Sequence, residues 1–127
     1  MGIRAWSQLT EAQVTTEEAR IIQQAVGSEA EQISGLEFQK GLEIELEHGT
    51  QFPDANVANN HPLLTGMIVL AHFKEMSDYY HRLEFAELEG DIMKAFQSGN
   101  RNTLFNKYKL LITARAKQVG EETSLLD

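Results

Sequence analysis

The pattern that most constrains the fold is a helix-start signal that occurs three times before residue 40. In each copy a Ser or Thr is followed three residues later by Glu. This is the pattern of a capping box, in which the hydroxyl and the carboxylate each accept a hydrogen bond from a backbone N–H at the helix start. Because the copies lie so close together, they predict short helices joined by tight turns. The pairs are Thr15 with Glu18, Ser28 with Glu31, and Ser34 with Glu37.

A helix is predicted over residues 35–48. Phe38, Leu42 and Leu46 follow one another at intervals of four, which places them on one face of that helix. Gly49 is expected to end it, because glycine readily adopts the left-handed conformation that helix C-termini use.

The Asn-rich segment at residues 50–61 predicts an ordered loop, since Asn side chains imitate backbone turns. Pro62 then suits the first position of a helix, with His61 as its N-cap. From 62 to 76 the apolar residues point in nearly all directions. We therefore expect this helix to be buried among the others, at the centre of the fold.

Two further helices are predicted towards the C-terminus. Ser77 is expected to cap the first of them, in which Gly90 allows a kink or a break. The second spans about 103–119, stops at Gly120 and leaves an acidic tail at 120–127. It carries one apolar stripe with Arg115 among its members, namely Leu104, Tyr108, Leu111, Ile112, Arg115 and Val119.

No segment alternates polar and apolar residues with the period of a strand, and no internal repeat is present. The fold prediction is all-α: a compact bundle of five or six short to medium helices around the helix at 62–76. We expect one domain over 1–127, made of a docking arm (1–14), a helical core (15–119) and the acidic tail.

The predicted arm contains two apolar residues, Trp6 and Leu9, without a clear helical period around them. In one interpretation they contact a protein partner or a neighbouring subunit. In the other, Trp6 folds back onto the core of its own chain. The sequence favours neither.

Charge and composition limit the class of partner. A net charge of -8 argues against binding to a phosphate backbone, and no apolar run approaches the length of about 20 residues that a membrane span requires. A local basic patch on the last helix is the weaker alternative, formed by Arg101, Lys107, Lys109, Arg115 and Lys117. With no cysteine, the chain has neither disulfides nor thiolate metal ligands.

Carboxylates and histidines are the candidate ligands for chemistry. Glu45 and His48 have the Glu-x-x-His spacing of carboxylate-bridged metal sites in helical bundles, and Asp78 with His81 repeats that spacing. Iron, manganese or zinc would suit such ligands. The competing interpretation, which we favour, is a hydrogen-bonded polar seam in which His72 faces Glu45 or Glu47. The candidate metal ligands are Glu45, Glu47, His48, His72, Glu75 and Asp78.

No motif for a catalytic site is apparent. The chain lacks a phosphate-binding glycine loop, a zinc-protease helix and a nucleophile elbow. The sequence therefore favours a protein that is not an enzyme and needs no cofactor.

The middle third of the chain resembles a small domain family of unknown function from bacteria and bacteriophages. The resemblance rests on FQKGLEIELEHG at 38–49, an Asn-Val pair and a proline, and TGMIVLAHFKEMSDYYHRL at 65–83. Asn60, His61, Met67 and Ser77 depart from the family pattern. The matching positions are Phe38, Gly41, Glu45, Glu47, His48, Gly49, Asn56, Val57, Pro62, Thr65, Gly66, Ile68, Ala71, His72, Glu75, Asp78, Tyr79, Tyr80 and Leu83.

The resemblance implies a bacterial or bacteriophage origin and a compact helical unit, but no reaction. We therefore expect a non-catalytic interaction or assembly protein, either a virion component or an accessory protein. It would be found in the bacterial cytoplasm or the phage virion and would bind a protein partner or itself. A helical protein that binds metal through carboxylates and histidines is the alternative.

Overall fold

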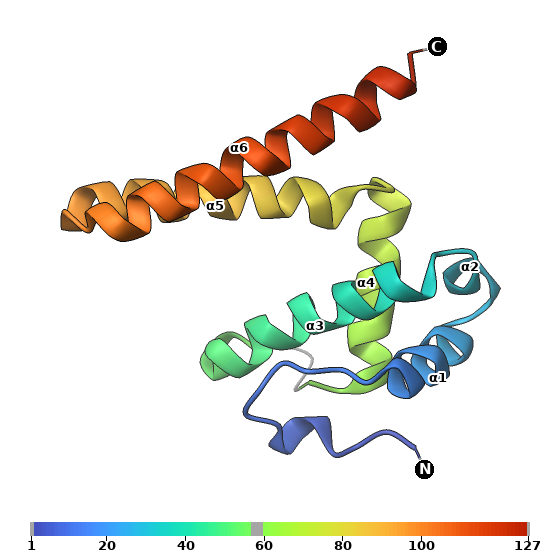
Figure 1. Ribbon diagram of the computed structural model, residues 1–127. Coiled ribbons are helices and arrows are strands. Elements are labelled where there is room, and N and C mark those ends of the chain that lie inside the picture. The colour runs from blue at the N-terminus through green and yellow to red at the C-terminus, as the bar shows by residue number, and fades with distance from the viewer. Residues whose placement is uncertain (1, 57–59, 127) are drawn as a thin grey trace. The chain divides into compact units, whose positions relative to one another are not determined.

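The computed structural model describes residues 2–56 and 60–126, which form six α-helices and two 3-10 turns without a strand (Figure 1). The all-α prediction of five or six helices is confirmed. The contacts divide the chain into two compact units, Met1–Ser77 and Asp78–Asp127. A single domain over the whole chain stays a prediction. The elements are η1 (Trp6–Gln8), α1 (Thr16–Val26), α2 (Ser28–Glu31), α3 (Gly35–Gln51), η2 (Pro53–Ala55), α4 (Pro62–Glu75), α5 (Tyr79–Ser98) and α6 (Arg101–Ser124).

In the first unit α1, α3 and α4 pack on one another around an apolar core. The predicted face of α3 is confirmed, since Phe38, Leu42 and Leu46 are all buried. Ile22 from α1 and Val69 from α4 are buried as well. One apolar face from each helix therefore closes this core.

The helix α4 is covered on one side only, which corrects the expectation that it is enclosed. Its buried residues are Thr65, Gly66 and Val69, whereas Leu64 and Met67 are exposed. An apolar residue on every side of a helix shows that all sides could be buried. Which side is covered depends on the neighbouring helices.

Helices begin at all three predicted starts, and two of the three carry the predicted side-chain cap. Thr15 and Glu18 form a complete capping box, and the Ser34 hydroxyl accepts a hydrogen bond from the backbone N–H of Glu37. A helix also begins at Ser28, but the capping box predicted there is wrong, because Ser28 is the first residue of α2 and the N-cap is Gly27, which makes no side-chain hydrogen bond. Gly27 has a φ of 129°, a conformation that L side chains rarely adopt.

Gly49 does not end its helix, because α3 continues through it to Gln51. A Cβ at this position would collide with the side chain of Asn60 and lie 2.9 Å from Nδ2 of Asn56. Residue 49 must therefore be glycine because Asn56 and Asn60 of the loop leave no room for a Cβ, and not because its φ is positive. Asn60 itself adopts the left-handed conformation that asparagine tolerates, with a φ of 55°.

The start of α4 agrees with the prediction. Pro62 is its first residue, and Nδ1 of the N-cap His61 accepts a hydrogen bond from the backbone N–H of Leu63 at 3.2 Å. His61 therefore has a structural role at the helix end.

The N-terminal arm folds back onto its own unit. Trp6 is 1% exposed, and its indole N–H donates to Oε2 of Glu18 at 3.1 Å. The structure thus decides for the second interpretation of Trp6 and corrects the first, while Leu9 is half-buried. At the end of the arm, the backbone N–H of Val14 donates to the Glu43 carboxylate at 3.0 Å.

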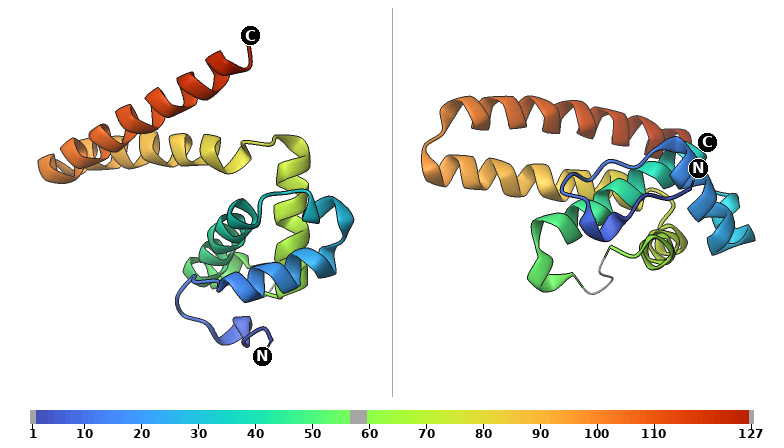
Figure 2. Two further views of the ribbon diagram at one scale, coloured as in Figure 1. Left: turned by 45° about the vertical axis from the view of Figure 1, so that its right-hand side comes forward. Right: turned by 90° about the horizontal axis from the view of Figure 1, so that it is seen from below.

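The second unit is a helical hairpin in which α5 and α6 run antiparallel (Figure 2). Gly99, with a φ of 72°, ends α5, and Asn100 caps α6 by accepting from the N–H of Thr103. Two expectations are corrected here: Asp78 rather than Ser77 is the N-cap of α5, and α6 continues as helix through Gly120 to Ser124. α5 also continues as helix through Gly90, so the break that this glycine allows does not occur.

The seam between α5 and α6 is narrow and differs from the predicted stripe. Its buried residues include Leu88 and Ala95 from α5 and Leu111 and Gln118 from α6. The predicted stripe was right for Leu111 and for the half-buried Leu104, but its other apolar members are exposed. These exposed members are Tyr108, Ile112 and Val119.

Candidate functional site

Glu45 of α3 lies beside two histidines in the first unit. Its Oε2 is 3.4 Å from Nε2 of His72 on α4, and its Oε1 is 3.9 Å from Nδ1 of His48, one helical turn away. Glu45 and His72 are largely covered, while about half of the His48 side chain is exposed. We call these three residues the Glu45 cluster. The Glu45 carboxylate thus faces one imidazole on its own helix and one on α4.

A cavity of about 200 Å³ adjoins the Glu45 cluster. Its polar lining includes Glu45, His48 and Thr65, and its apolar lining includes Phe52 and Ile68. The packing of α3 on α4 brings these residues together, since Thr65 and Ile68 belong to α4. The imidazole of His48 therefore borders a space large enough for a few water molecules or a small ligand.

Two of the other candidate ligands face solvent. Glu47 is exposed and accepts a hydrogen bond from the side chain of Gln51 at 3.0 Å, and Glu75 is exposed at the end of α4. Glu45 and Glu47, both on α3, were the two partners considered for His72. The structure places Glu45 beside it. The reason is helical spacing, because residues 45 and 47 lie on different sides of α3.

Asp78 belongs to the second unit, where it is held by other side chains. Its Oδ1 accepts from Nε of Arg82 at 3.0 Å and its Oδ2 from Nε2 of Gln118 at 3.1 Å. Hydrogen bonding from Arg82 lowers the pKa of this carboxyl. Asp78 thus links the N-terminus of α5 to the C-terminal part of α6.

Across residues 2–56 and 60–126, no three His, Asp or Glu side chains are arranged so that they could hold a metal ion. In the same residues, no helix is long and apolar enough to cross a membrane.

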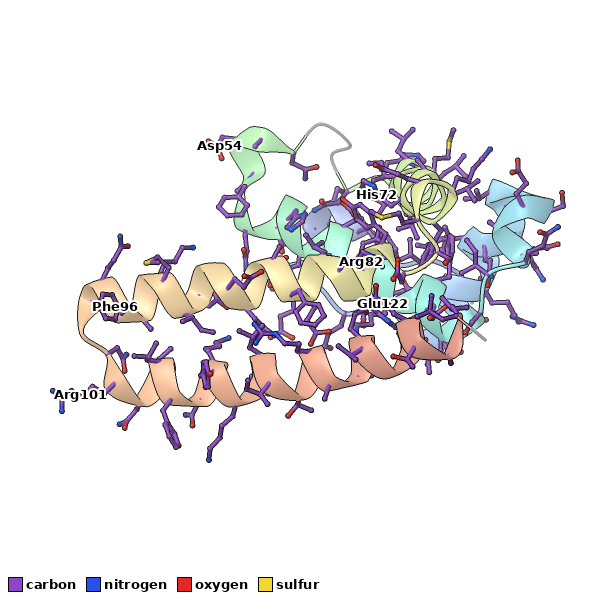
Figure 3. All side chains as sticks on the ribbon, turned by 90° about the horizontal axis from the view of Figure 1, so that it is seen from above. Asp54, His72, Arg82, Phe96, Arg101 and Glu122 are labelled. Atoms are coloured by element: carbon purple, nitrogen blue, oxygen red, sulfur yellow. The ribbon has the colours of Figure 1, made fainter. Side chains whose placement is uncertain are left out.

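The hairpin presents a second candidate site, an exposed apolar surface. Phe96 and Phe105 are 70% and 62% exposed, on either side of the connection between the helices. Figure 3 shows Phe96 and Arg101 at this connected end, and Arg82 and Glu122 towards the other end. We call this surface the apolar face, and it consists of Met93, Phe96, Phe105, Tyr108, Ile112 and Val119.

Charges on the hairpin are divided between its helices. α5 carries four acidic and two basic residues, whereas α6 carries five basic and two acidic ones. Ion pairs join them, with Lys107 Nζ 3.2 Å from Asp91 Oδ2 and Arg82 Nη2 3.6 Å from Glu122 Oε2. Two of the basic residues considered as a patch therefore interact within the hairpin. Lys107 pairs with Asp91, and Nζ of Lys109 lies 4.6 Å from the centre of the Phe105 ring.

A family described as a protein of unknown function (DUF5661) matches residues 10–89. The chain belongs to this family. The matched segment of DUF5661 contains α1 to α4 and the first half of α5, and it extends well beyond the resemblance noted at 38–83. No curated protein and no solved structure matches the chain.

The two candidate sites differ in their relation to DUF5661. The Glu45 cluster lies inside the matched segment, whereas every residue of the apolar face follows it. Val57, one of the positions in the resemblance, lies outside the described residues.

Sequence reasoning missed two features of the structure. Glu18 was noted only as half of a capping box, yet it is buried and also holds Arg4 and Trp6. The exposed Met93, Phe96 and Phe105 were not recognised as one surface. A heptad count along both helices would have shown it, because Phe96, Phe105 and Ile112 each follow a seam residue by one position.

Proposed function

We propose that this DUF5661 protein is a non-catalytic interaction or assembly protein that binds a protein partner through the hairpin. The observation that supports it is the apolar face, six large exposed side chains on two packed helices. Large exposed apolar patches on soluble proteins mark interaction sites, because leaving them in water is unfavourable. The proposed setting is a bacterial cell or a phage particle, as the resemblance implies.

The test asks whether the apolar face mediates any association. Purified chain is measured by light scattering alone and after addition of extract from bacteria or phage particles. We expect a complex larger than one chain that is lost when Phe105 and Ile112 are both changed to Lys. A chain that remains a monomer in both conditions would overturn the proposal. Leu110→Lys is the control, because the exposure of Leu110 lies between those of Phe105 and Ile112 but the residue lies on the other side of α6.

The second candidate function is metal binding at the Glu45 cluster. It is favoured by one observation, the position of the Glu45 carboxylate within 4 Å of nitrogens from both His48 and His72. A zinc ion would require ligand atoms about 2.0–2.2 Å from one point.

Elemental analysis of protein purified without chelator tests this second function. Metal binding predicts close to one equivalent of a transition metal that is lost in Glu45→Gln and kept in the exposed control Glu47→Gln. Metal below about a tenth of an equivalent, with no change in melting temperature after chelation, would exclude it.

A further inference from the structure

The apolar face is a regular stripe alongside the seam of the hairpin. Seam residues recur at intervals of seven, at Leu88 and Ala95 on α5 and at Leu104, Leu111 and Gln118 on α6. Such spacing is that of helices packed along a shared seam. The residues one position later are Glu89, Phe96, Phe105, Ile112 and Val119.

These following residues lie on one side of the hairpin. A step of one residue turns about 100° in the same sense on every right-handed helix. In an antiparallel pair whose seams face each other, this step points to the same side from both helices. Of these five following residues, all except Glu89 are large, apolar and exposed. The opposite side carries the exposed Leu110 together with charged residues, including Glu87, Asp91 and Lys117.

We propose that a second copy of this chain covers the apolar face, so that two hairpins pack face to face as an antiparallel four-helix bundle. This inference rests on the proposed function and names its partner. A bundle of four helices has a core to which each helix contributes two neighbouring stripes. Both helices of this hairpin carry two apolar stripes, but the hairpin alone buries only the seam and leaves the apolar face exposed.

Charge complementarity supports a second copy as the occupant. Because α6 is basic overall and α5 is acidic overall, α5 of one copy and α6 of another attract each other, whereas two α6 helices or two α5 helices side by side would repel. A two-fold axis parallel to the helices places α5 of each copy beside α6 of the other. Every neighbouring pair of helices is then antiparallel and of opposite net charge. The pairing of Asp91 with Lys107 shows the same complementarity inside one hairpin.

This arrangement also places apolar side chains of the two copies at the same level along the bundle axis. Phe96 and Phe105 stand at similar distances from the connection, so each would meet the other residue of the second copy. Aromatic side chains can bury roughly 150–250 Å² each, so Phe96, Phe105 and Tyr108, which are more than half exposed, supply on the order of 300–450 Å² per copy, to which Met93, Ile112 and Val119 add. Stable complexes bury about 800 Å² per partner, which neighbouring aliphatic stems can complete.

The first experiment measures self-association of the full chain by sedimentation across a range of concentrations. We expect a dimer that Ile112→Lys weakens by at least about tenfold, because a substitution at the centre of an interface has the largest effect. The control Leu110→Lys is expected to leave the dimer unchanged. Circular dichroism of each variant checks that the helices remain formed.

The second experiment tests the pairing itself, using the absence of cysteine from the chain. Phe96→Cys and Phe105→Cys proteins are mixed and oxidised. The proposal predicts a disulfide mainly between the two different variants, because Phe96 of one copy is beside Phe105 of the other. Leu110→Cys is the control and is expected to cross-link far more slowly with either.

Three results would overturn the inference: a monomer at all concentrations, a dimer that Ile112→Lys leaves intact, or equal cross-linking by Leu110→Cys. A monomer that nevertheless forms a complex in extract, sensitive to Phe105→Lys with Ile112→Lys, would keep the proposed function and assign the face to a different protein. The failure of the two proposals is therefore distinguishable.

Discussion

The guanidinium of Arg4 contacts both carboxylate oxygens of Glu18, with Nη2 2.8 Å from Oε1 and Nε 3.0 Å from Oε2. The same carboxylate accepts from the indole of Trp6 and from the backbone N–H groups of Thr15 and Arg4. Glu18 is 1% exposed, so these donors replace the water that a buried charge has lost. This one side chain both starts α1 and binds the N-terminal arm to it.

Replacing Glu18 by Gln should destabilise the first unit. Gln keeps the size of the side chain but removes the charge that pairs with Arg4, and its amide cannot accept all the donors. We expect a loss of about 2–3 kcal/mol in the free energy of unfolding. Urea denaturation followed by the fluorescence of Trp6 measures it. The exposed Glu17→Gln should change stability by less than about 0.5 kcal/mol, and equal effects at the two positions would contradict the role of Glu18.

Stability should also fall in acid in a way that depends on Glu18. Burial alone would raise the pKa of this carboxyl, but hydrogen bonds from Arg4, Thr15 and Trp6 outweigh it and lower the pKa from 4.5 to about 2. The folded state thus binds the proton more weakly than the unfolded state. The resulting stability, on the order of 3 kcal/mol, is complete above the unfolded pKa and is lost as the pH falls from about 4.5 to about 2.

The measurement compares wild-type protein with Glu18→Gln in urea at pH 6, 4 and 3. The difference in their free energies of unfolding should shrink steadily as the pH falls. A difference that stays constant would show that the charge of Glu18 does not contribute.

Gly66→Ala should destabilise the contact between α4 and α1. A Cβ at residue 66 would lie 2.5 Å from Cγ2 of Ile22 and 2.9 Å from Cγ2 of Val26, so the helices would have to move apart. We expect a loss of about 1–3 kcal/mol. Gly35→Ala is the control, because its Cβ would meet only Gln23 Oε1 at 3.9 Å. Thermal unfolding of the two variants decides whether close packing at Gly66 is required.

Gly120→Ala should stabilise α6. The glycine lies inside the helix and a Cβ there would meet nothing within 4 Å, so alanine removes only the excess freedom of the unfolded chain. The expected gain is about 0.5–1 kcal/mol. Gly99→Ala should instead destabilise the hairpin, because the φ of 72° at the connection is unfavourable for alanine. Thermal unfolding should therefore shift in opposite directions, and a shift in the same direction would contradict the helical conformation at residue 120.

The Glu45 cluster was predictable in part. The three-residue spacing of Glu45 and His48 fixes their proximity within one helix. The expected packing of the helix at 62–76 against the helix at 35–48 allowed His72 to face Glu45 or Glu47. The choice of Glu45 over Glu47, and the exposure of Glu75, required the actual crossing of α4 over α3. The hydrogen bond between Asp78 and Gln118 could not be predicted either, because the two residues are 40 positions apart in the chain.

The sequence by itself determined that the chain is helical, where α1, α3 and α4 begin, and which face of α3 enters the core. These features depend on residues three or four positions apart, whose geometry the helix itself fixes. Only the tertiary structure decided that Trp6 folds back, that α4 exposes Leu64 and Met67, and that Gly49 serves a close contact. It also decided which of the two apolar stripes of α6 forms the seam with α5. Periodicity shows which residues share a side of a helix, but which sides meet depends on surfaces brought together from distant parts of the chain.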